Sequence, residues 1–272
     1  MGTGGRARTL ARAATTVARD RLGVDIRRVP RPSAAATPGS AAPATKPAVT
    51  KSTVLYEVDE QFQAVYADAA ARSGGGQISQ ARMYNLVQAL AFTRGVDGLV
   101  AECGVYRGFS SYVLCRYLGL EDPAFTGGGF HAFDSFEGLS DLAPPDRAGD
   151  AAIPGPPREA GLFKGSLDDV RHTLADFPDV AYHQGWIPAV FDGTPEGPFR
   201  LVHVDVDLHD PTRDALAWFH PRLAPGGMMV VDDYGSIRWP GARAAVDRFG
   251  ADHGVPVLPL SSAQALLFGP GR

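Results

Sequence analysis

The chain has 272 residues and a formal net charge of −4, and 44% of its residues are hydrophobic. These values suit a globular protein with one domain of about 150–250 residues and an extension, and the acidic balance argues against nucleic acid or an anionic membrane as a partner. Its two cysteines are too few for a disulfide-held secreted scaffold, and no apolar run is long enough to span a membrane. We therefore expect a cytoplasmic protein without a transmembrane segment.

The first 50 residues differ in composition from the rest of the chain. Residues 1–32 carry eight arginines against two acids, and residues 30–50 consist mostly of proline, alanine, serine and threonine. We expect residues 1–50 to form a flexible extension. The alternative is a short basic amphipathic helix that binds a membrane surface or a partner. A signal peptide is not expected, because no apolar core follows the charges.

From residue 54 the hydrophobic pattern becomes regular. Helical spacing over residues 56–72 and 78–92, ahead of any strand, predicts a helical cap within residues 51–95. Residues 96–272 alternate short apolar runs with helical segments, which predicts an α/β fold with a mostly parallel, seven-stranded sheet and helices on both faces. Strands are expected at 99–103, 130–134, 180–184, 199–205 and 228–231, helices at 110–120, 167–177, 211–223 and 237–253, and a closing antiparallel hairpin at 255–260 and 264–268.

A glycine loop of the form E-x-G-x-x-x-G follows the first predicted strand. Gly104 lets the backbone turn tightly and approach a ligand, and Gly108 and Ser110 open the next helix, whose positive end suits an anionic group. Glu102 would repel a dinucleotide pyrophosphate but attract the ammonium and sulfonium groups of S-adenosylmethionine. The alternative is an ordinary strand–turn–helix connection that binds nothing.

Asp134 ends the second predicted strand. A carboxylate there can accept hydrogen bonds from both ribose hydroxyls of a nucleoside, in NAD as well as in S-adenosylmethionine. Phe136 is expected to flank the adenine and residues 163–166 to contact its edge, unless they serve only for packing and as a helix N-cap. The residues expected to bind the cofactor are Glu102, Gly104, Tyr106, Gly108, Ser110, Asp134, Ser135, Phe136, Gly165 and Ser166.

Two neighbouring strands each end in a pair of aspartates: Asp205 with Asp207, and Asp232 with Asp233. Because parallel strands end at the same edge of a sheet, the four carboxylates should lie close together and repel one another unless a cation neutralises them. Oxygen ligands without cysteine favour Mg²⁺, Ca²⁺ or Mn²⁺ over zinc. The alternative is that these acids cap the following helices and contact water.

Six sequence blocks together resemble the macrocin O-methyltransferase family, metal-dependent sugar methyltransferases of antibiotic biosynthesis. They are AECGVYRG (101–108), FDSFEGL (133–139), VDVDL (204–208), PRLAPGG (221–227), DDYG (232–235) and WPGARAAVD (239–247). The resemblance spans roughly residues 77–268 and implies a Rossmann-like class I methyltransferase that uses S-adenosylmethionine and Mg²⁺ to methylate a sugar hydroxyl. The family's metal ligands correspond to Asp205 or Asp207, together with Asp232 and Asp233.

The chain departs from this family at His209, where a tyrosine or another aromatic residue is common. His209 is therefore a candidate proton acceptor beside Asp205 and Asp207, unless it only replaces the aromatic packing. Residues 138–161 form a Pro/Gly-rich loop of the kind that closes over an acceptor, but its composition does not identify the acceptor.

Three alternatives to sugar methylation follow from the same residues. Metal chelation would equally serve a catechol or phenol acceptor. A nicotinamide-dependent oxidoreductase is disfavoured by the missing G-x-G-x-x-G and by Glu102, and a non-catalytic binding protein by the complete acidic set. We expect the partner to be a small-molecule acceptor, a sugar or glycoside, and not nucleic acid; the sequence also allows a homo-oligomer.

Overall fold

The structure is a computed structural model that describes residues 54–74, 78–147 and 158–270. Contacts divide the chain into residues 1–51 and residues 52–272, and the second unit is described below. The expectations for residues 1–50 and for the middle of the loop at 138–161 lie outside the described residues. Within the described ranges, no helix is long and apolar enough to cross a membrane.

One sheet runs through the described part of the chain, with seven strands in the order β3–β2–β1–β4–β5–β7–β6. The strands from β1 to β5 pair in parallel, β7 pairs antiparallel with β5, and β6 pairs antiparallel with β7. The predicted α/β fold with a mostly parallel sheet and a closing hairpin is confirmed. The strands are β1 (Leu99–Cys103), β2 (Phe130–Asp134), β3 (Ala181–Gln184), β4 (Phe199–Val204), β5 (Leu223–Val231), β6 (Val257–Pro259) and β7 (Ala265–Phe268).

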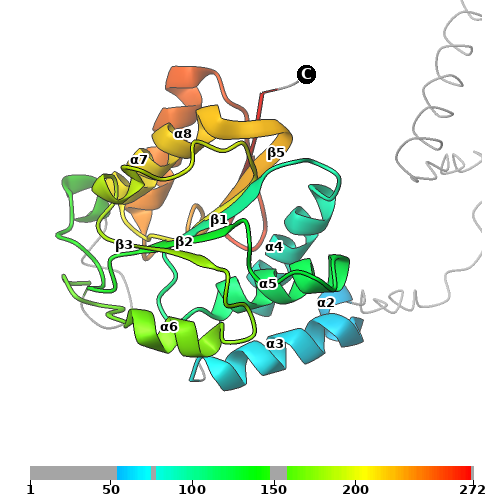
Figure 1. Ribbon diagram of the computed structural model, residues 1–272. Helices are drawn as coiled ribbons and strands as arrows, with labels where there is room; N and C mark the ends of the chain where they lie inside the picture. Colours follow the sequence, from blue (N-terminus) through cyan, green and yellow to red (C-terminus); the bar gives the residue numbers. More distant parts are fainter. Residues whose placement is uncertain (1–53, 75–77, 148–157, 271–272) are drawn as a thin grey trace, which may run out of the picture. The chain divides into compact units, whose positions relative to one another are not determined.

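Helices cover both faces of this sheet (Figure 1). The layer with α3, α4 and α5 shares one buried cluster with the sheet, and the layer with α7 and α8 shares another. The helices are α2 (Leu55–Val58), α3 (Glu60–Arg72), α4 (Gln80–Phe92), α5 (Phe109–Glu121), α6 (Leu167–Thr173), α7 (His209–Phe219) and α8 (Pro240–His253), and the 3-10 turns are η1 (Pro144–Arg147), η3 (Ala189–Phe191) and η4 (His220–Arg222).

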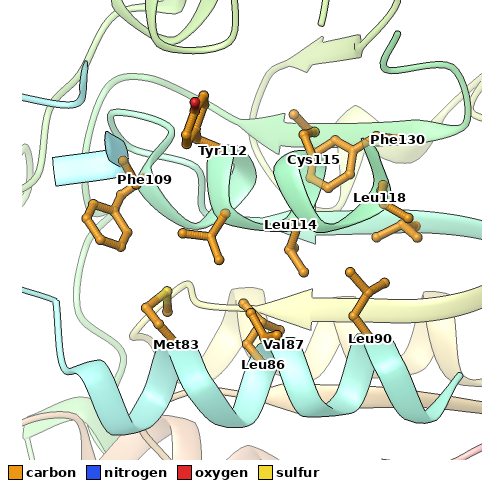
Figure 2. Packing of buried hydrophobic residues seen from close by; sticks show 14 of the residues in the cluster. Met83, Leu86, Val87, Leu90, Phe109, Tyr112, Leu114, Cys115, Leu118 and Phe130 are labelled. Carbon is orange, nitrogen blue, oxygen red and sulfur yellow. The ribbon is translucent and has the colours of Figure 1, made fainter. Parts of the chain in front are cut away.

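The apolar stripe of α4 fixes this helix to the molecule. Met83, Leu86, Val87 and Leu90 recur every three or four positions, which places them on one side of the helix, and all four are buried. Figure 2 shows them directed toward α5, where Leu114 lies between the two helices. A fully buried side chain of this kind contributes about 1.5–3 kcal/mol. The first turn of α4 is therefore held firmly in place.

Element boundaries differ from the predictions where local chemistry changes. The helix expected at 211–223 begins at His209 and ends at Phe219, because Pro221 lacks an amide hydrogen and the chain continues as η4. The fifth strand begins at Leu223, not at Met228, because Leu223 already pairs with Phe199 of β4.

Candidate functional site

A cavity of about 780 Å³ opens at the carboxyl ends of β1, β2, β4 and β5. This volume lies within the usual range for cofactor and ligand pockets, about 300–1,000 Å³. The start of α4 also contributes to the wall, through Ile78, Ser79 and Arg82. Nine residues expected from the sequence line it: Gly104, Tyr106, Ser110, Asp134, Ser135, Asp205, Asp207, Asp232 and Asp233. The other six expected residues lie outside this wall: Glu102, Gly108, Phe136, Gly165, Ser166 and His209.

Glu102 is fully buried within β1. Its side chain lies on the sheet face that carries Val100, where the Ser111 hydroxyl of α5 donates to one carboxylate oxygen and His203 Nδ1 lies 2.7 Å from the other. Side chains within a strand project from the faces of the sheet, not from its end. Glu102 is therefore not part of the cavity wall, and its predicted role in binding the cofactor stays a prediction.

Asp134 holds the glycine loop. Its Oδ2 accepts hydrogen bonds from the amides of Val105, at 2.7 Å, and Tyr106, at 2.8 Å, and its Oδ1 accepts one from the amide of Phe136, at 2.6 Å. Because each carboxylate oxygen can accept about two hydrogen bonds, Oδ1 retains one acceptor position. Asp134 can thus fix the loop and still accept from a ribose hydroxyl, which remains a prediction.

Gly104 is the position in this loop that requires glycine. Its φ is +85°, and a β-carbon there would lie 1.8 Å from the carbonyl oxygen of Asp205. A side chain would therefore separate β1 from the loop that follows β4. The close approach brings the predicted cofactor loop next to the acidic residues.

Four residues that were predicted to bind the cofactor lie outside the cavity wall and make packing or capping contacts. Phe136 is packed into the core, and a β-carbon on Gly108 would press against α6. Gly165 packs against the carbonyl oxygen of Tyr106, and Ser166 caps the start of α6 through its hydroxyl oxygen. Packing and helix capping, the alternatives given for Phe136 and Ser166, account for these contacts; the predicted adenine contacts of Phe136, Gly165 and Ser166, and the predicted role of Gly108 in opening the helix toward the cofactor, stay predictions.

The four aspartates converge, because β4 and β5 are parallel neighbours that end together. Carboxylate oxygens of Asp205, Asp207 and Asp233 lie within 4.8 Å of one another, and Asp205 also belongs to a second such group with Asp232 and His203. Asp207 and Asp233 have positive φ angles of 59° and 63°, in the left-handed region that aspartate tolerates better than most residues. The predicted juxtaposition is confirmed; the role of these residues as metal ligands stays a prediction.

The closeness of the four carboxylates changes their pKa values. Burial and the neighbouring carboxylates raise the pKa of Asp205 and of Asp207 well above the usual value, and burial also raises the pKa of Asp233. Burial acts on Asp232 in the same sense, but the hydrogen bond and charge of His203 outweigh it and lower the pKa. These carboxylates therefore do not all ionise easily together, and the cluster favours the uptake of a proton or a cation.

His203 lies between Glu102 and Asp232, and it was not predicted from the sequence. It is fully buried in β4, with Nδ1 at 2.7 Å from Glu102 and Nε2 at 3.3 Å from Asp232. Burial lowers the pKa of His203, but the two carboxylates outweigh it and raise the pKa well above the usual value. A polar residue inside an apolar strand, Leu201-Val202-His203-Val204, was the signal that could have identified it.

Arg82 and Gln264 were also missed. Arg82 Nη1 lies 3.3 Å from Asp232 Oδ2, and Arg82 Nη2 lies 2.9 Å from Asp233 Oδ1. Gln264, fully buried next to β7, donates to Asp232 Oδ1 at 2.6 Å. Both residues are far from the aspartates in sequence, and Arg82 occupies an ordinary helical position that no motif marks.

His209 lies at the start of α7. Its amide donates to Asp146 Oδ1 at 2.8 Å, and its ring Nδ1 lies 2.8 Å from Asp210 Oδ1. The cavity wall at this point consists of Asp210 and Pro211. His209 itself is not part of the wall, and its role as a proton acceptor or as a packing residue stays a prediction.

Comparisons with known proteins agree with this geometry. A family model described as Macrocin-O-methyltransferase (TylF) matches residues 43–263. The chain is 31% identical over 144 residues to the 8-demethyl-8-(2,3-dimethoxy-alpha-L-rhamnosyl)-tetracenomycin-C 4'-O-methyltransferase of Streptomyces olivaceus, a match that covers 52% of this chain and 54% of that protein. The match thus spans about half the length of that relative.

A second relative and a solved structure extend the comparison. The mycinamicin III 3''-O-methyltransferase of Micromonospora griseorubida is 29% identical over 192 residues, which covers 65% of this chain and 71% of that protein. The structure of the O-methyltransferase NovP superposes with a TM-score of 0.60 and 24% identity, over 72% of this chain and 81% of the NovP chain. The likeness to NovP confirms the fold.

Proposed function

The chain belongs to the macrocin-O-methyltransferase (TylF) family, and we propose that it transfers the methyl group of S-adenosylmethionine to a hydroxyl of a sugar-bearing small molecule with the aid of Mg²⁺. The observation that carries this proposal is the convergence of four aspartates on the wall of a cofactor-sized cavity. Both relatives are named as O-methyltransferases of natural products, one of which bears a rhamnosyl group. We therefore favour a glycosylated acceptor over a free catechol.

The wall of the cavity suits S-adenosylmethionine in shape and charge. Gly104 and Ser110 line the cavity, and Ser110 lies in the first turn of α5, whose positive end favours a carboxylate. Asp134 Oδ1 retains an acceptor position for a ribose hydroxyl. The bound cofactor would supply an electrophilic methyl group on a sulfonium centre.

The acidic cluster suits a hard divalent cation, because its donors are carboxylate oxygens. Asp205 belongs to both groups of closely spaced ligand atoms, so we assign the metal to Asp205, Asp232 and Asp233. When bound, Mg²⁺ would lower the pKa of a coordinated sugar hydroxyl and neutralise the cluster.

Asp207 is then available to accept the proton of the acceptor hydroxyl. It is half-buried on the cavity wall, and its carboxylate oxygen lies within 4.8 Å of those of Asp205 and Asp233. A carboxylate held beside the reacting hydroxyl can act as a general base.

The test is methyl transfer by the full chain from methyl-labelled S-adenosylmethionine to a panel of glycosylated natural products and catechols. We expect labelled product from a glycoside, loss of transfer with EDTA, and recovery with Mg²⁺ or Mn²⁺. Calorimetry with S-adenosylhomocysteine and NADH provides the matched binding control, and only the former should bind. Transfer that persists in EDTA would contradict the metal role, and binding of NADH in place of S-adenosylhomocysteine would contradict the proposal.

A further inference from the structure

Arg82 is a cation built into the acidic cluster. It projects from the first turn of α4, on the side of the sheet that carries Glu102 and His203, and contacts Asp232 and Asp233 at 3.3 and 2.9 Å. Its side chain is 22% exposed, whereas those of Asp232 and Asp233 are 2% and 6% exposed. Such an ion pair lies well inside the protein, where solvent screens it little.

The guanidinium is held in this position from two directions. Arg82 Nε donates to the carbonyl oxygen of Ser262, at 3.2 Å, and the apolar stripe of α4 anchors the helix itself. An arginine guanidinium keeps its proton in proteins, and both carboxylates lie within ion-pair distance of it. The group is therefore a fixed positive charge at the place where we propose that a metal binds.

We propose that Arg82 is a resident counter-ion that neutralises Asp232 and Asp233 in the metal-free protein and weakens the binding of a divalent cation to the same carboxylates. This inference rests on the metal site of the proposed function. The guanidinium uses Asp232 Oδ2 and Asp233 Oδ1 as acceptors, and a second cation beside it is repelled. A metal ion must therefore displace the guanidinium or share these oxygens with it.

Arg82 is not the only group that holds these carboxylates in place. Gln264 donates to Asp232 Oδ1 at 2.6 Å, and His203 Nε2 lies 3.3 Å from the same oxygen. Asp233 is only 6% exposed and is enclosed beside Asp205 and Asp207, which limits the movement of its side chain. Removal of Arg82 would thus free acceptor oxygens without releasing the side chains that carry them, so its loss should favour metal binding.

The experiment measures Mn²⁺ binding to the EDTA-treated full chain by electron paramagnetic resonance. We expect Arg82→Gln to lower the Mn²⁺ dissociation constant about tenfold or more, because a positive charge near the ion is removed. Arg82→Lys keeps the charge and should stay within about threefold of wild type. The matched control is Arg248→Gln, which removes a 77% exposed arginine paired with Asp252 on α8 and should change nothing.

Thermal unfolding gives a second readout. Metal-free Arg82→Gln should unfold at a lower temperature than wild type and gain more from added Mn²⁺, because its carboxylates lack a counter-ion until the metal binds. For the case in which this variant does not fold without metal, wild type carries the test: the Arg82 Nε–Hε NMR resonance, identified by its absence in Arg82→Lys, should shift when Mg²⁺ is added.

The outcomes separate this inference from the proposed function. If wild type binds Mn²⁺ and Arg82→Gln binds it equally or more weakly, or if the Arg82 resonance does not respond to Mg²⁺ in a protein that binds it, the counter-ion role is overturned while the metal site stands. If neither wild type nor Arg82→Gln binds Mn²⁺, both the metal site and the counter-ion role are overturned.

Discussion

The carboxylates at β1 and β2 and those beyond β4 and β5 belong to the same edge of the sheet, yet they are held in opposite ways. Glu102 and Asp134 are surrounded by donors: a hydroxyl and an imidazole for the first, three amides for the second. Asp205 and Asp207 face other carboxylates instead, which together with burial raise the pKa of each. Satisfied acids maintain the structure, whereas crowded acids retain the capacity to bind a cation or a proton.

The largest effect is expected from removing the two aspartates that follow β5. Asp232→Ala combined with Asp233→Ala should reduce methyl transfer by about 1,000-fold or more, since metal assistance contributes several kcal/mol. The glycine loop that is predicted to bind the cofactor follows β1 and contains neither aspartate, so S-adenosylhomocysteine should bind within about threefold of wild type. Radiolabel transfer and calorimetry measure the two effects. Normal turnover in the double variant would show that the cluster is structural.

Glu102 represents the satisfied acids in its strongest form. Glu102→Ala leaves His203 buried with one carboxylate partner fewer, and removing one member of a buried ion pair costs about 3–5 kcal/mol. Glu102→Gln keeps an acceptor of the same shape and should lose less. Urea denaturation compares the two variants. If the alanine variant were as stable as wild type, the pairing with His203 would not be a structural interaction.

Asp134 is expected to have a smaller effect, divided between stability and binding. Asp134→Ala deprives the amides of Val105, Tyr106 and Phe136 of their acceptor, which should cost about 1–3 kcal/mol and loosen the loop. The affinity for S-adenosylhomocysteine should fall about tenfold. Asp134→Asn retains one carbonyl oxygen and serves as the graded control. Unchanged affinity in the alanine variant would argue that this loop does not bind the cofactor.

His209 should give the smallest effect. Its ring contacts Asp210 of the cavity wall, but His209 is not itself part of that wall, so His209→Phe should keep kcat within about threefold of wild type. Asp207→Asn provides the comparison, because it removes the proposed proton acceptor and should reduce kcat far more. A large loss of kcat in His209→Phe, with normal binding of the cofactor, would return His209 to the mechanism.

The sheet edge could be predicted from the sequence, because local pattern determines it. The apolar runs at 99–103 and 130–134 match β1 and β2, and adjacent parallel strands must bring their terminal aspartates together. The side-chain directions were harder to predict. Glu102 belongs to the strand and points from its face, and Phe136 follows Asp134 but turns into the core.

Partners that come from distant segments could not be predicted. Arg82 reaches Asp232 across 150 positions of sequence, and Gln264 reaches it from the closing hairpin. Such contacts depend on how α4 and β7 pack against the sheet, and single-sequence periodicity gives the face of a helix but not the residue opposite it. His203 was also missed, but its sequence did carry a signal, since a buried strand rarely contains an imidazole without a polar partner.

The closing hairpin connects the carboxyl-terminal part of the chain to the acidic cluster. Gln264 binds Asp232, and beyond β7 the amide of Gly269 donates to the carbonyl of Gly227 at 2.8 Å. A truncation placed before this segment would remove both the hydrogen-bond donor Gln264 and strand β7. Tags and fusions at the carboxyl terminus therefore belong after Gly269.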